Sequence, residues 1–373
     1  MPAKQNVNEL WYVPSPYLGY EINRSAFVLW ERGPPKQMNT EGDNQFDEFG
    51  NEKPGEHYYS NDIGARVERP GQSATSSDIV FLGCSWAMGY GNEYEDSFAY
   101  KVSQKTGKTS VTLGVGGYGL LQSVRRLEKY VETLRPSVVV IAFGSWLITR
   151  SFRNTPFPAP IIQRPVFVYD KEVNDFKIRE VDLIVSIATL RNYIKYGKTN
   201  AAAAKTITKL YDSLFLLRRL SNNGNFARVS KNLLGKRKEY YINPDIVGEE
   251  IFELARKHVA EYCIGRLAEL GQTYGFKSVV HFLYPYHEPE MVPRLQLDGE
   301  YIEGAISKES GIFIDSCAHE KTLFDSWLRE AGHRPDAYRD AFHLSHANHP
   351  NSNGHDVIAE AICGQLANRD LLN

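Results

Sequence analysis

The stretch IVFLGCSWAMGYG, residues 79–91, joins an apolar run to a serine and a glycine-rich turn. A short apolar run that ends on glycine is typical of a buried β-strand, and residues 94–104 have the pattern of a helix. Ser85 is therefore predicted to lie at a strand-to-helix turn. In α/β enzymes, this is a position at which a nucleophile is exposed.

Five strand-like runs occur along the chain, and helical periodicity separates most of them. The strands are predicted over residues 78–83, 110–115, 137–144, 277–285 and 311–316. Helices are predicted over residues 120–134 and 251–270. Near-continuous apolar strands that alternate with helices form a parallel sheet covered on both faces. The sequence therefore predicts an α/β fold, a three-layer α/β/α sandwich with a parallel sheet.

Two regions depart from this alternation. Residues 1–76 are rich in Pro, Gly, Asn and aromatic side chains and show little periodicity, which predicts an irregular N-terminal extension packed on the core. The α/β domain is predicted over residues 77–373, with a basic, helical insertion at about 150–240. In this insertion we expect a small β excursion and two helices, over residues 164–180, 185–196 and 201–220 respectively.

The net charge of the 373-residue chain is -2 and its pI is about 6.6, which gives no broad basic surface for nucleic acid. The charge is nevertheless uneven, because residues 191–240 carry twelve Lys or Arg and only two acidic residues. A helix of this composition either exposes a solvated basic face or contacts a membrane surface or an anionic substrate. We expect no nucleic-acid partner, and the sequence leaves the oligomeric state open.

The cysteines and the N-terminus indicate the compartment. Four cysteines are scattered without CxxC spacing, as buried free thiols are, and they predict neither disulfides nor a zinc site. They are Cys84, Cys263, Cys317 and Cys363. The N-terminal residues contain no apolar signal-peptide core, and no apolar stretch reaches the length that crosses a bilayer. We therefore expect a cytoplasmic protein.

A serine nucleophile needs a base, and the best candidate lies near the other end of the chain. The segment AFHLSHANHPNSNGHDVIAEAI, residues 341–362, places His349 in a loop rich in Pro, Asn and Gly. An amphipathic helix is predicted from about Gly354. Because loops at the C-terminal edge of a parallel sheet assemble the sites of such enzymes, Ser85 and His349 are predicted to meet there.

Three blocks of the sequence resemble the SGNH or GDSL-type hydrolases, a family of esterases and acyltransferases. The first block, GCSWAMGYG at residues 83–91, keeps Ser85 between glycines but has Cys84 where the family has an aspartate. The second block, LGVGGYGLLQ at residues 113–122, matches well, and the last, HPNSNGH at residues 349–355, matches closely. The order and spacing of the three blocks also resemble the family.

The resemblance covers residues 77–145 and 277–368, and it extends weakly to two lead-in segments. These segments are YLGYEI at residues 17–22 and YSNDIGAR at residues 59–66. The resemblance implies a flavodoxin-like SGNH hydrolase fold, to which the N-terminal extension and the insertion are added.

The resemblance also implies roles for individual residues. Ser85 would be the nucleophile and His349 its base, and the backbone N–H groups of Ser85 and Gly117 would form the oxyanion hole. Gly116 is the alternative donor. The side chains predicted to line the substrate site are Trp86, Trp146 and Arg150.

The third block departs from the family pattern. It normally supplies an Asn side chain to the oxyanion hole, whereas this chain has Ser145 and Trp146 there. The loss of one such donor typically costs about a hundredfold or more in rate. The oxyanion hole is therefore predicted to lack one donor or to use a replacement.

The acidic residue that orients the histidine is also missing from its usual place. It normally stands two or three residues before the histidine, where this chain has Ala347 and His346. Asp336 and Asp340 are nearby but out of register. The chain would then use a Ser–His dyad, orient His349 through Asn348 or a main-chain carbonyl, or be a weakened enzyme.

Other interpretations of the first two blocks are open. Ser85 could be only the N-cap of a helix. Cys84 could be the reactive group, since a thiol at a helix N-terminus can have a lowered pKa, although its strand parity points it into the core. The glycines of GVGGYG, residues 114–119, could suggest a dinucleotide-binding loop, but their spacing is not GxGxxG.

Four histidines near the C-terminus could bind a metal. They are His343, His346, His349 and His355. No carboxylate or cysteine partner accompanies them, and the hydrolase block already accounts for their pattern, so we expect no metal and no cofactor. His355 is predicted to cap or pack at the start of the last helix.

The sequence thus predicts a serine esterase or acyltransferase that acts on a small-molecule or carbohydrate ester, for example an O-acetyl group on a sugar. The alternative hypothesis, motivated by the missing Asn and Asp, is a catalytically weakened protein of the same fold. Such a protein would bind a carbohydrate or an anionic surface partner. Covalent reaction with a fluorophosphonate separates the two hypotheses.

Overall fold

The structure is a computed structural model of the whole chain. It describes residues 12–15, 17–31, 55–152, 164–180, 239–285, 289–306, 311–315, 317–334, 337–344 and 347–372.

Five parallel strands form the centre of the fold. They are β6 (Ile79–Leu82), β7 (Ser110–Thr112), β8 (Val138–Phe143), β12 (Lys277–Phe282) and β13 (Ile312–Asp315). In the sheet they lie in the order β13-β12-β8-β6-β7. Numbered along the chain and read from the β7 end, this order is 2-1-3-4-5, which is the flavodoxin-like arrangement. The predicted flavodoxin-like fold is therefore confirmed, and each predicted strand is present.

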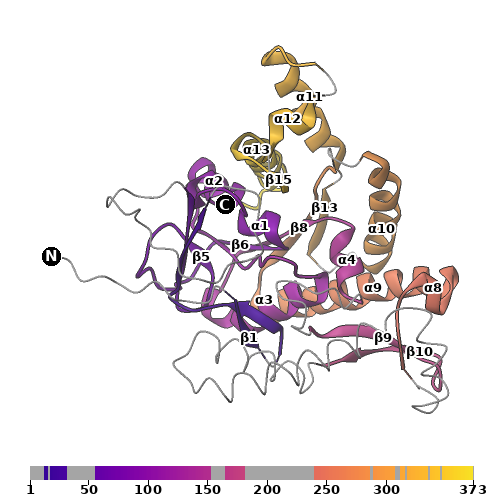
Figure 1. Cartoon of the computed structure of the whole chain (residues 1–373). Helices are drawn as coiled ribbons and strands as arrows, with labels where there is room; N and C mark the ends of the chain where they lie inside the picture. The colour runs from indigo at the N-terminus through magenta and orange to yellow at the C-terminus, as the bar shows by residue number, and fades with distance from the viewer. Residues whose placement is uncertain are drawn as a thin grey trace, which may run out of the picture.

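Helices cover both faces of this sheet (Figure 1). Alternate residues of β6 face opposite sides: Val80 and Leu82 belong to one buried cluster, whereas Ile79 and Phe81 belong to another. The first cluster lies under α3 (Leu120–Leu134) and α9 (Glu249–Tyr274). The second lies under α2 (Phe98–Thr106), α11 (Cys317–Glu330) and α13 (Ser352–Asn368). Burial on both faces explains why the central strands β6 and β8 are apolar at every position rather than at alternate ones.

The helix boundaries agree with local end signals. The prediction over residues 120–134 coincides with α3, and the prediction over 251–270 lies within α9, which ends at Gly275 with a φ of 82°. The helix predicted over residues 94–104 was placed too early. Ser97 is extended and caps α2 by accepting a hydrogen bond from the Tyr100 N–H, so only a 3₁₀ turn, η1 (Tyr94–Asp96), precedes it.

The N-terminal region contains strands, so the prediction of an irregular extension was wrong. β1 (Tyr12–Ser15) and β2 (Gly19–Ile22) form a hairpin. Antiparallel pairing through β5 (Arg66–Val67) and β4 (Gly55–Ser60) to β3 (Phe27–Glu31) extends the central sheet beyond β7. β5 is only two residues long, and such a strand shows no periodicity in sequence.

The N-terminal region packs on the core, as predicted. Tyr20 and Tyr58 are fully buried, and they share a cluster with Met88 and Tyr118. Met88 is the last residue of α1 (Ser85–Met88), which follows β6, and Tyr118 lies in the loop that follows β7. The extension therefore contacts the C-terminal edge of the sheet, where the sequence places the site.

The β excursion predicted over residues 164–180 is present. It is a hairpin of β9 (Val166–Asp170) and β10 (Asp175–Arg179), and β11 (Glu239–Tyr241) joins β9 on its other side. The helices predicted over residues 185–196 and 201–220 lie outside the described residues, as does most of the basic stretch 191–240. Of the helices that the structure describes, none has the length and apolarity to cross a bilayer.

The remaining helices and strands of the described residues connect these elements. They are α1 (Ser85–Met88), α4 (Trp146–Arg150), α8 (Pro244–Val247), η2 (Pro289–Met291), α10 (Val292–Ala305), α12 (Tyr338–Phe342), β14 (His343–Leu344) and β15 (Ala347–Pro350). All four cysteines are free thiols, as predicted; Cys84 and Cys263 are buried and the other two are half-buried. Burial raises the pKa of Cys363 to about 11, so this thiol stays protonated at neutral pH.

Candidate active site

Ser85 and His349 meet at the C-terminal edge of the sheet. After β6 ends at Leu82, Gly83 turns the chain with a φ of 146°, and Ser85 is the first residue of α1. A side chain on Gly83 would have the wrong φ, and its Cβ would lie 3.1 Å from the Ala142 carbonyl oxygen. The Ser85 Oγ lies 2.7 Å from the His349 Nε2, although the two residues are 264 positions apart. This distance lets the imidazole accept the hydroxyl proton.

The alternative interpretations of the first block do not agree with this geometry. Cys84, not Ser85, is at the N-cap position of α1, and no side-chain cap is formed. Cys84 is buried in the cluster under α3, and the indole N–H of Trp146 donates to its Sγ at 3.2 Å. The sequence prediction that Cys84 points into the core is confirmed.

A fully buried arginine fixes the loop that follows Ser85. The Arg66 guanidinium donates hydrogen bonds to the carbonyls of Met88, Gly89 and Asn92, and to that of His57 on β4. It also lies 3.9 Å from the centre of the Tyr58 ring. Arg66 thus joins the N-terminal strands to the turn that presents Ser85.

The histidine side of the site is held by two asparagines. Asn351 caps α13 by accepting from the Gly354 N–H, and its amide nitrogen donates to the carbonyls of Ala341 and His343. The amide nitrogen of Asn92 donates to the Pro350 carbonyl at 2.9 Å. These bonds fix the chain directly after His349, at Pro350 and Asn351. The two β-strands β14 and β15 pair with one another across this segment.

Aromatic rings also contact the segment that contains His349. The Tyr90 ring lies 4.8 Å from the His349 ring, measured between centres. His355, six residues later, is fully buried, and its Nδ1 accepts a hydrogen bond from the Phe98 N–H at 3.2 Å. Burial holds the pKa of His355 well below its usual value, so this ring is neutral and can accept. His355 packs in the first turn of α13, as predicted, and its hydrogen bond goes to the start of α2.

The predicted oxyanion donor Gly117 lies in a tight turn. The Tyr118 N–H donates to the Val115 carbonyl, and Gly117 has a φ of 78°, which is the third position of a type II turn. The Tyr20 hydroxyl donates to the Gly116 carbonyl at 2.9 Å. In a trans peptide the N–H points opposite to the carbonyl, so Tyr20 fixes the direction of the Gly117 N–H. Within the described ranges, no acceptor is found for that N–H.

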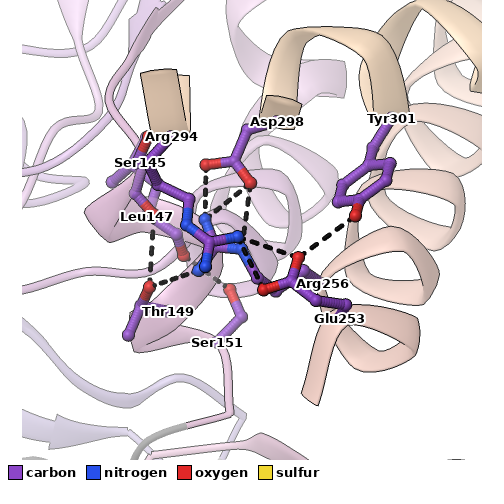
Figure 2. Close-up of polar contacts among 9 residues, drawn as sticks. All are labelled: Ser145, Leu147, Thr149, Ser151, Glu253, Arg256, Arg294, Asp298 and Tyr301. Carbon is purple, nitrogen blue, oxygen red and sulfur yellow. Dashed lines mark hydrogen bonds and ion pairs between the residues drawn. The ribbon is translucent and has the colours of Figure 1, made fainter. Parts of the chain in front are cut away.

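The third block of the family pattern falls at the start of α4. A buried ion pair holds this helix in place (Figure 2). Arg256 on α9 and Asp298 on α10 pair with one another, and both are almost fully buried. Arg256 also donates to the Thr149 hydroxyl on α4 at 2.8 Å. Burial raises the pKa of Asp298, and Arg256 and, to a smaller extent, the Ser145 hydroxyl act against this rise; Ser145 is itself buried beside the network. The network positions α4, which carries two predicted substrate-site residues.

The three predicted substrate-site side chains lie on α1 and α4. The rings of Trp86 and Trp146 are 5.3 Å apart between centres and tilted by 49°. Trp86 is buried, whereas Trp146 and Arg150 are half-buried. The predicted role of all three in substrate binding stays a prediction.

Asn348, the side chain proposed to orient His349, and the residues around the usual place of the acid lie largely outside the described part of the chain. Asp336 and His346 are not described, and the side chains of Asp340, Ala347 and Asn348 are also outside it. Where side chains are described, no group of three or more His, Cys, Asp or Glu residues is arranged to hold a metal ion.

Sequence reasoning missed four side chains that shape the site: Tyr20, Arg66, Asn92 and Arg164. Arg164 lies just before β9, and its guanidinium donates to the Gly117 carbonyl at 2.6 Å. A signal existed for two of them, because the weak lead-in segments YLGYEI and YSNDIGAR contain Tyr20 and Arg66. Both of these residues donate to loops at the C-terminal edge of the sheet.

No protein-family profile and no curated protein matches this chain. Several solved structures are similar to it. LAE5, an α/β hydrolase enzyme from the metagenome of Lake Arreo, Spain, is 14% identical over 80% of this chain and 98% of its own, with a TM-score of 0.39. Est2A, an acetyl xylan esterase from the rumen bacterium Butyrivibrio proteoclasticus, is 9% identical over 83% and 68%, with a TM-score of 0.37. A carbohydrate esterase is 10% identical over 83% and 69%, with a TM-score of 0.36.

Proposed function

We propose that this protein is a serine esterase or acyltransferase that forms an acyl-enzyme on Ser85, with His349 as its base. The observation that carries this proposal is the 2.7 Å distance between the Ser85 Oγ and the His349 Nε2. A nucleophile and a base in hydrogen-bonding contact, presented at the C-terminal edge of a parallel sheet, are the arrangement that covalent acyl transfer requires.

In the first half of the reaction, the Ser85 Oγ attacks the acyl carbonyl while its proton moves to the His349 Nε2. The carbonyl oxygen becomes an oxyanion, which the N–H groups of Ser85 and Gly117 stabilise. When the tetrahedral intermediate collapses, the bond to the alcohol oxygen breaks, and that oxygen takes the proton from His349. The products of this half are the free alcohol and the acyl ester of Ser85.

In the second half, His349 removes a proton from an incoming acceptor, which attacks the acyl-enzyme. Collapse of the second intermediate returns the proton to the Ser85 Oγ. With water as the acceptor the product is a free acid, and with a sugar hydroxyl it is a new ester. Hydrolysis and transfer therefore use the same residues and differ only in the acceptor.

The substrate that we propose is a small-molecule or carbohydrate ester, with an O-acetyl sugar as the leading example. The paired rings of Trp86 and Trp146 support this choice, because aromatic side chains with a few polar groups are the usual lining of small-molecule sites. Trp146 contacts Cys84, the neighbour of Ser85, so the indole pair lies close to the reacting hydroxyl.

A second candidate function is binding without turnover, and the position of Ser145 favours it. The family pattern has an oxyanion donor here, whereas the Ser145 hydroxyl is buried beside the Asp298 carboxylate. A protein with this loss would bind a carbohydrate or an anionic surface partner through the same residues.

Fluorophosphonate labelling of the wild type, Ser85→Ala and Cys84→Ala tests the proposal, with the adduct located by mass spectrometry. We expect an adduct on Ser85 in the wild type and in Cys84→Ala, and none in Ser85→Ala. We also expect Ser85→Ala to lower kcat/KM for 4-nitrophenyl acetate by about a thousandfold or more. Absence of an adduct on wild-type protein that is folded by circular dichroism would favour the binding function. Equal labelling of Ser85→Ala would reject Ser85 as the nucleophile.

A further inference from the structure

Two arginines lie beside the loop that carries the proposed oxyanion donor. Arg164 donates to the Gly117 carbonyl at 2.6 Å. The end of α4 packs on the same loop, because a Cβ on Gly119 would lie 2.8 Å from the carbonyl carbon of Arg150. The Gly117 loop is therefore flanked by the side chain of Arg164 and by the helix end that bears Arg150.

The charges of these arginines act on one another. Arg164 is 2% exposed, and its burial lowers its pKa, with the positive charge of Arg150 lowering it further. Tyr20, which both arginines influence, does not supply a compensating negative charge, because burial raises its pKa to about 12. Arg164 is thus buried beside the Gly117 loop, and the half-buried Arg150 is near enough to act on its charge.

Carboxylates near α4 are already paired with other cations. Asp298 pairs with Arg256, and Glu253 pairs with Arg294 on α10 (Figure 2). In the described part of the chain, the buried Nη1 of Arg150 has no hydrogen-bond acceptor. The sequence from Arg150 to residue 164 also contains no Asp or Glu.

Arg150 is on the side of α4 that leads to the nucleophile. Trp146 is four residues earlier, so the two side chains lie on the same face of the helix. The Trp146 indole reaches the Cys84 Sγ, and Cys84 adjoins Ser85. A ligand group that contacts both Trp146 and Arg150 would therefore be part of a molecule bound near the Ser85 hydroxyl.

We propose that Arg150, with Arg164 beside it, binds an anionic oxygen group of the ester substrate, either a carboxylate or a phosphate. A guanidinium presents two parallel N–H donors to such a group, and a half-buried position strengthens the contact. An anion here would also offset the repulsion between the two arginines. This inference rests on the proposed function, and it narrows the substrate class from esters in general to acidic esters.

Two pairs of esters test it, and within each pair one member has a free, negatively charged carboxylate and the other has the same group as a neutral methyl ester. Mono-4-nitrophenyl succinate and its methyl ester place the charge on the acyl side, whereas 4-acetoxybenzoate and its methyl ester place it on the alcohol side. We expect the wild type to prefer the charged member of at least one pair by about tenfold or more in kcat/KM. An O-acetylated sugar phosphate, used in place of 4-acetoxybenzoate, tests whether the anionic site binds a phosphate rather than a carboxylate.

Substitutions at Arg150 assign the preference. Arg150→Gln should lower the charged-to-neutral ratio of kcat/KM by about tenfold to a hundredfold, and Arg150→Lys should retain part of it. Arg329→Gln, an exposed arginine in the last turn of α11, is the control and should leave the ratio unchanged. The proposal is overturned if the wild type prefers neither charged ester, or if Arg150→Gln lowers charged and neutral esters in equal proportion.

Binding to Ser85→Ala separates this inference from the proposed function. Calorimetric titration with 4-acetoxybenzoate, mono-4-nitrophenyl succinate and their methyl esters needs no turnover. Tighter binding of a charged ester, lost in Ser85→Ala/Arg150→Gln, would support the anionic site even if the wild type cleaved no ester. Equal binding of the charged and methyl esters would reject the anionic site, whatever the labelling of Ser85 shows.

Discussion

The two sides of the candidate site are held in different ways. The serine side, residues 83–92, is fixed by a buried cation from another part of the chain, because Arg66 donates to three carbonyls within residues 88–92. The histidine side, residues 343–351, is fixed by neutral amides. Asn351 donates to two carbonyls near its own helix, and Asn92 reaches across from the serine side to Pro350.

This difference indicates which side is the firmer one. Hydrogen bonds from a charged donor are roughly twice as strong as those between neutral groups, and an unpaired buried carbonyl is costly. The serine side is thus anchored by the N-terminal strands, while the histidine side depends largely on its own local turn. The N-terminal extension, which has no reacting residue, therefore sets the position of the nucleophile.

The largest effect is expected from Arg66→Met. The substitution leaves three buried carbonyls and one partly buried carbonyl without their donor, so we expect a loss of about 3–5 kcal/mol in the free energy of unfolding. Urea denaturation measures this loss. We also expect slower fluorophosphonate labelling of the folded fraction, because the turn after Ser85 loses its anchor.

Arg126→Met is the matched control. Arg126 is also fully buried, and it donates to the carbonyls of Leu113 and Gly64, away from the turn after Ser85. It should destabilise the fold to a similar extent, with a smaller effect on labelling. If the two variants slow labelling equally, Arg66 has no special relation to the serine side.

A smaller effect is expected from Asn351→Ala on the histidine side. Loss of the α13 cap and of two neutral hydrogen bonds should cost about 1–3 kcal/mol in the free energy of unfolding. Since these bonds hold the segment of His349, kcat/KM should fall by more than stability alone explains. Asn353→Ala is the control, because within the described residues Asn353 donates one hydrogen bond, to the Ala341 carbonyl at 3.3 Å. Equal kcat/KM values for the two variants would show that Asn351 does not position His349.

The same contrast explains what the sequence could predict. The strands β6 and β8 are apolar at every position because both of their faces are buried, so each is visible in its own residues. The helix α3 was predicted with its observed bounds for a similar local reason. β5 is two residues long and exists only through pairing with β4 and β7, and no local pattern announces such pairing.

The residues of the candidate site also fall into two groups: those that the sequence could predict and those that it could not. Ser85, Gly117 and His349 lie in motifs that the sequence displays, and the structure brings Ser85 and His349 into contact. The contacts of Arg66 and Arg164 are made to backbone carbonyls, which every residue carries. Because any residue can supply a backbone carbonyl, the sequence does not show which residues Arg66 and Arg164 would contact. These contacts could be identified only from the structure.

The smallest effect is expected from Tyr20→Phe, which tests whether the N-terminal extension also sets the oxyanion donor. Burial raises the pKa of Tyr20 to about 12, so at ordinary pH its hydroxyl is a proton donor and holds the Gly116 carbonyl. Without that bond the peptide between Gly116 and Gly117 can tilt, and the Gly117 N–H loses its direction. We expect kcat/KM for 4-nitrophenyl acetate to fall by about tenfold, less than the loss on removing an oxyanion donor outright.

Tyr118→Phe is the control for Tyr20→Phe, because the Tyr118 hydroxyl donates to the Tyr20 carbonyl in the same aromatic cluster. Both variants remove one buried tyrosine hydroxyl and should lose similar stability, but only Tyr20 contacts the Gly116 carbonyl. A larger fall in kcat for Tyr20→Phe, with little change in KM, would indicate a contact that matters mainly in the transition state. Equal kcat values would indicate that the N-terminal extension acts on the site only by anchoring the serine side through Arg66.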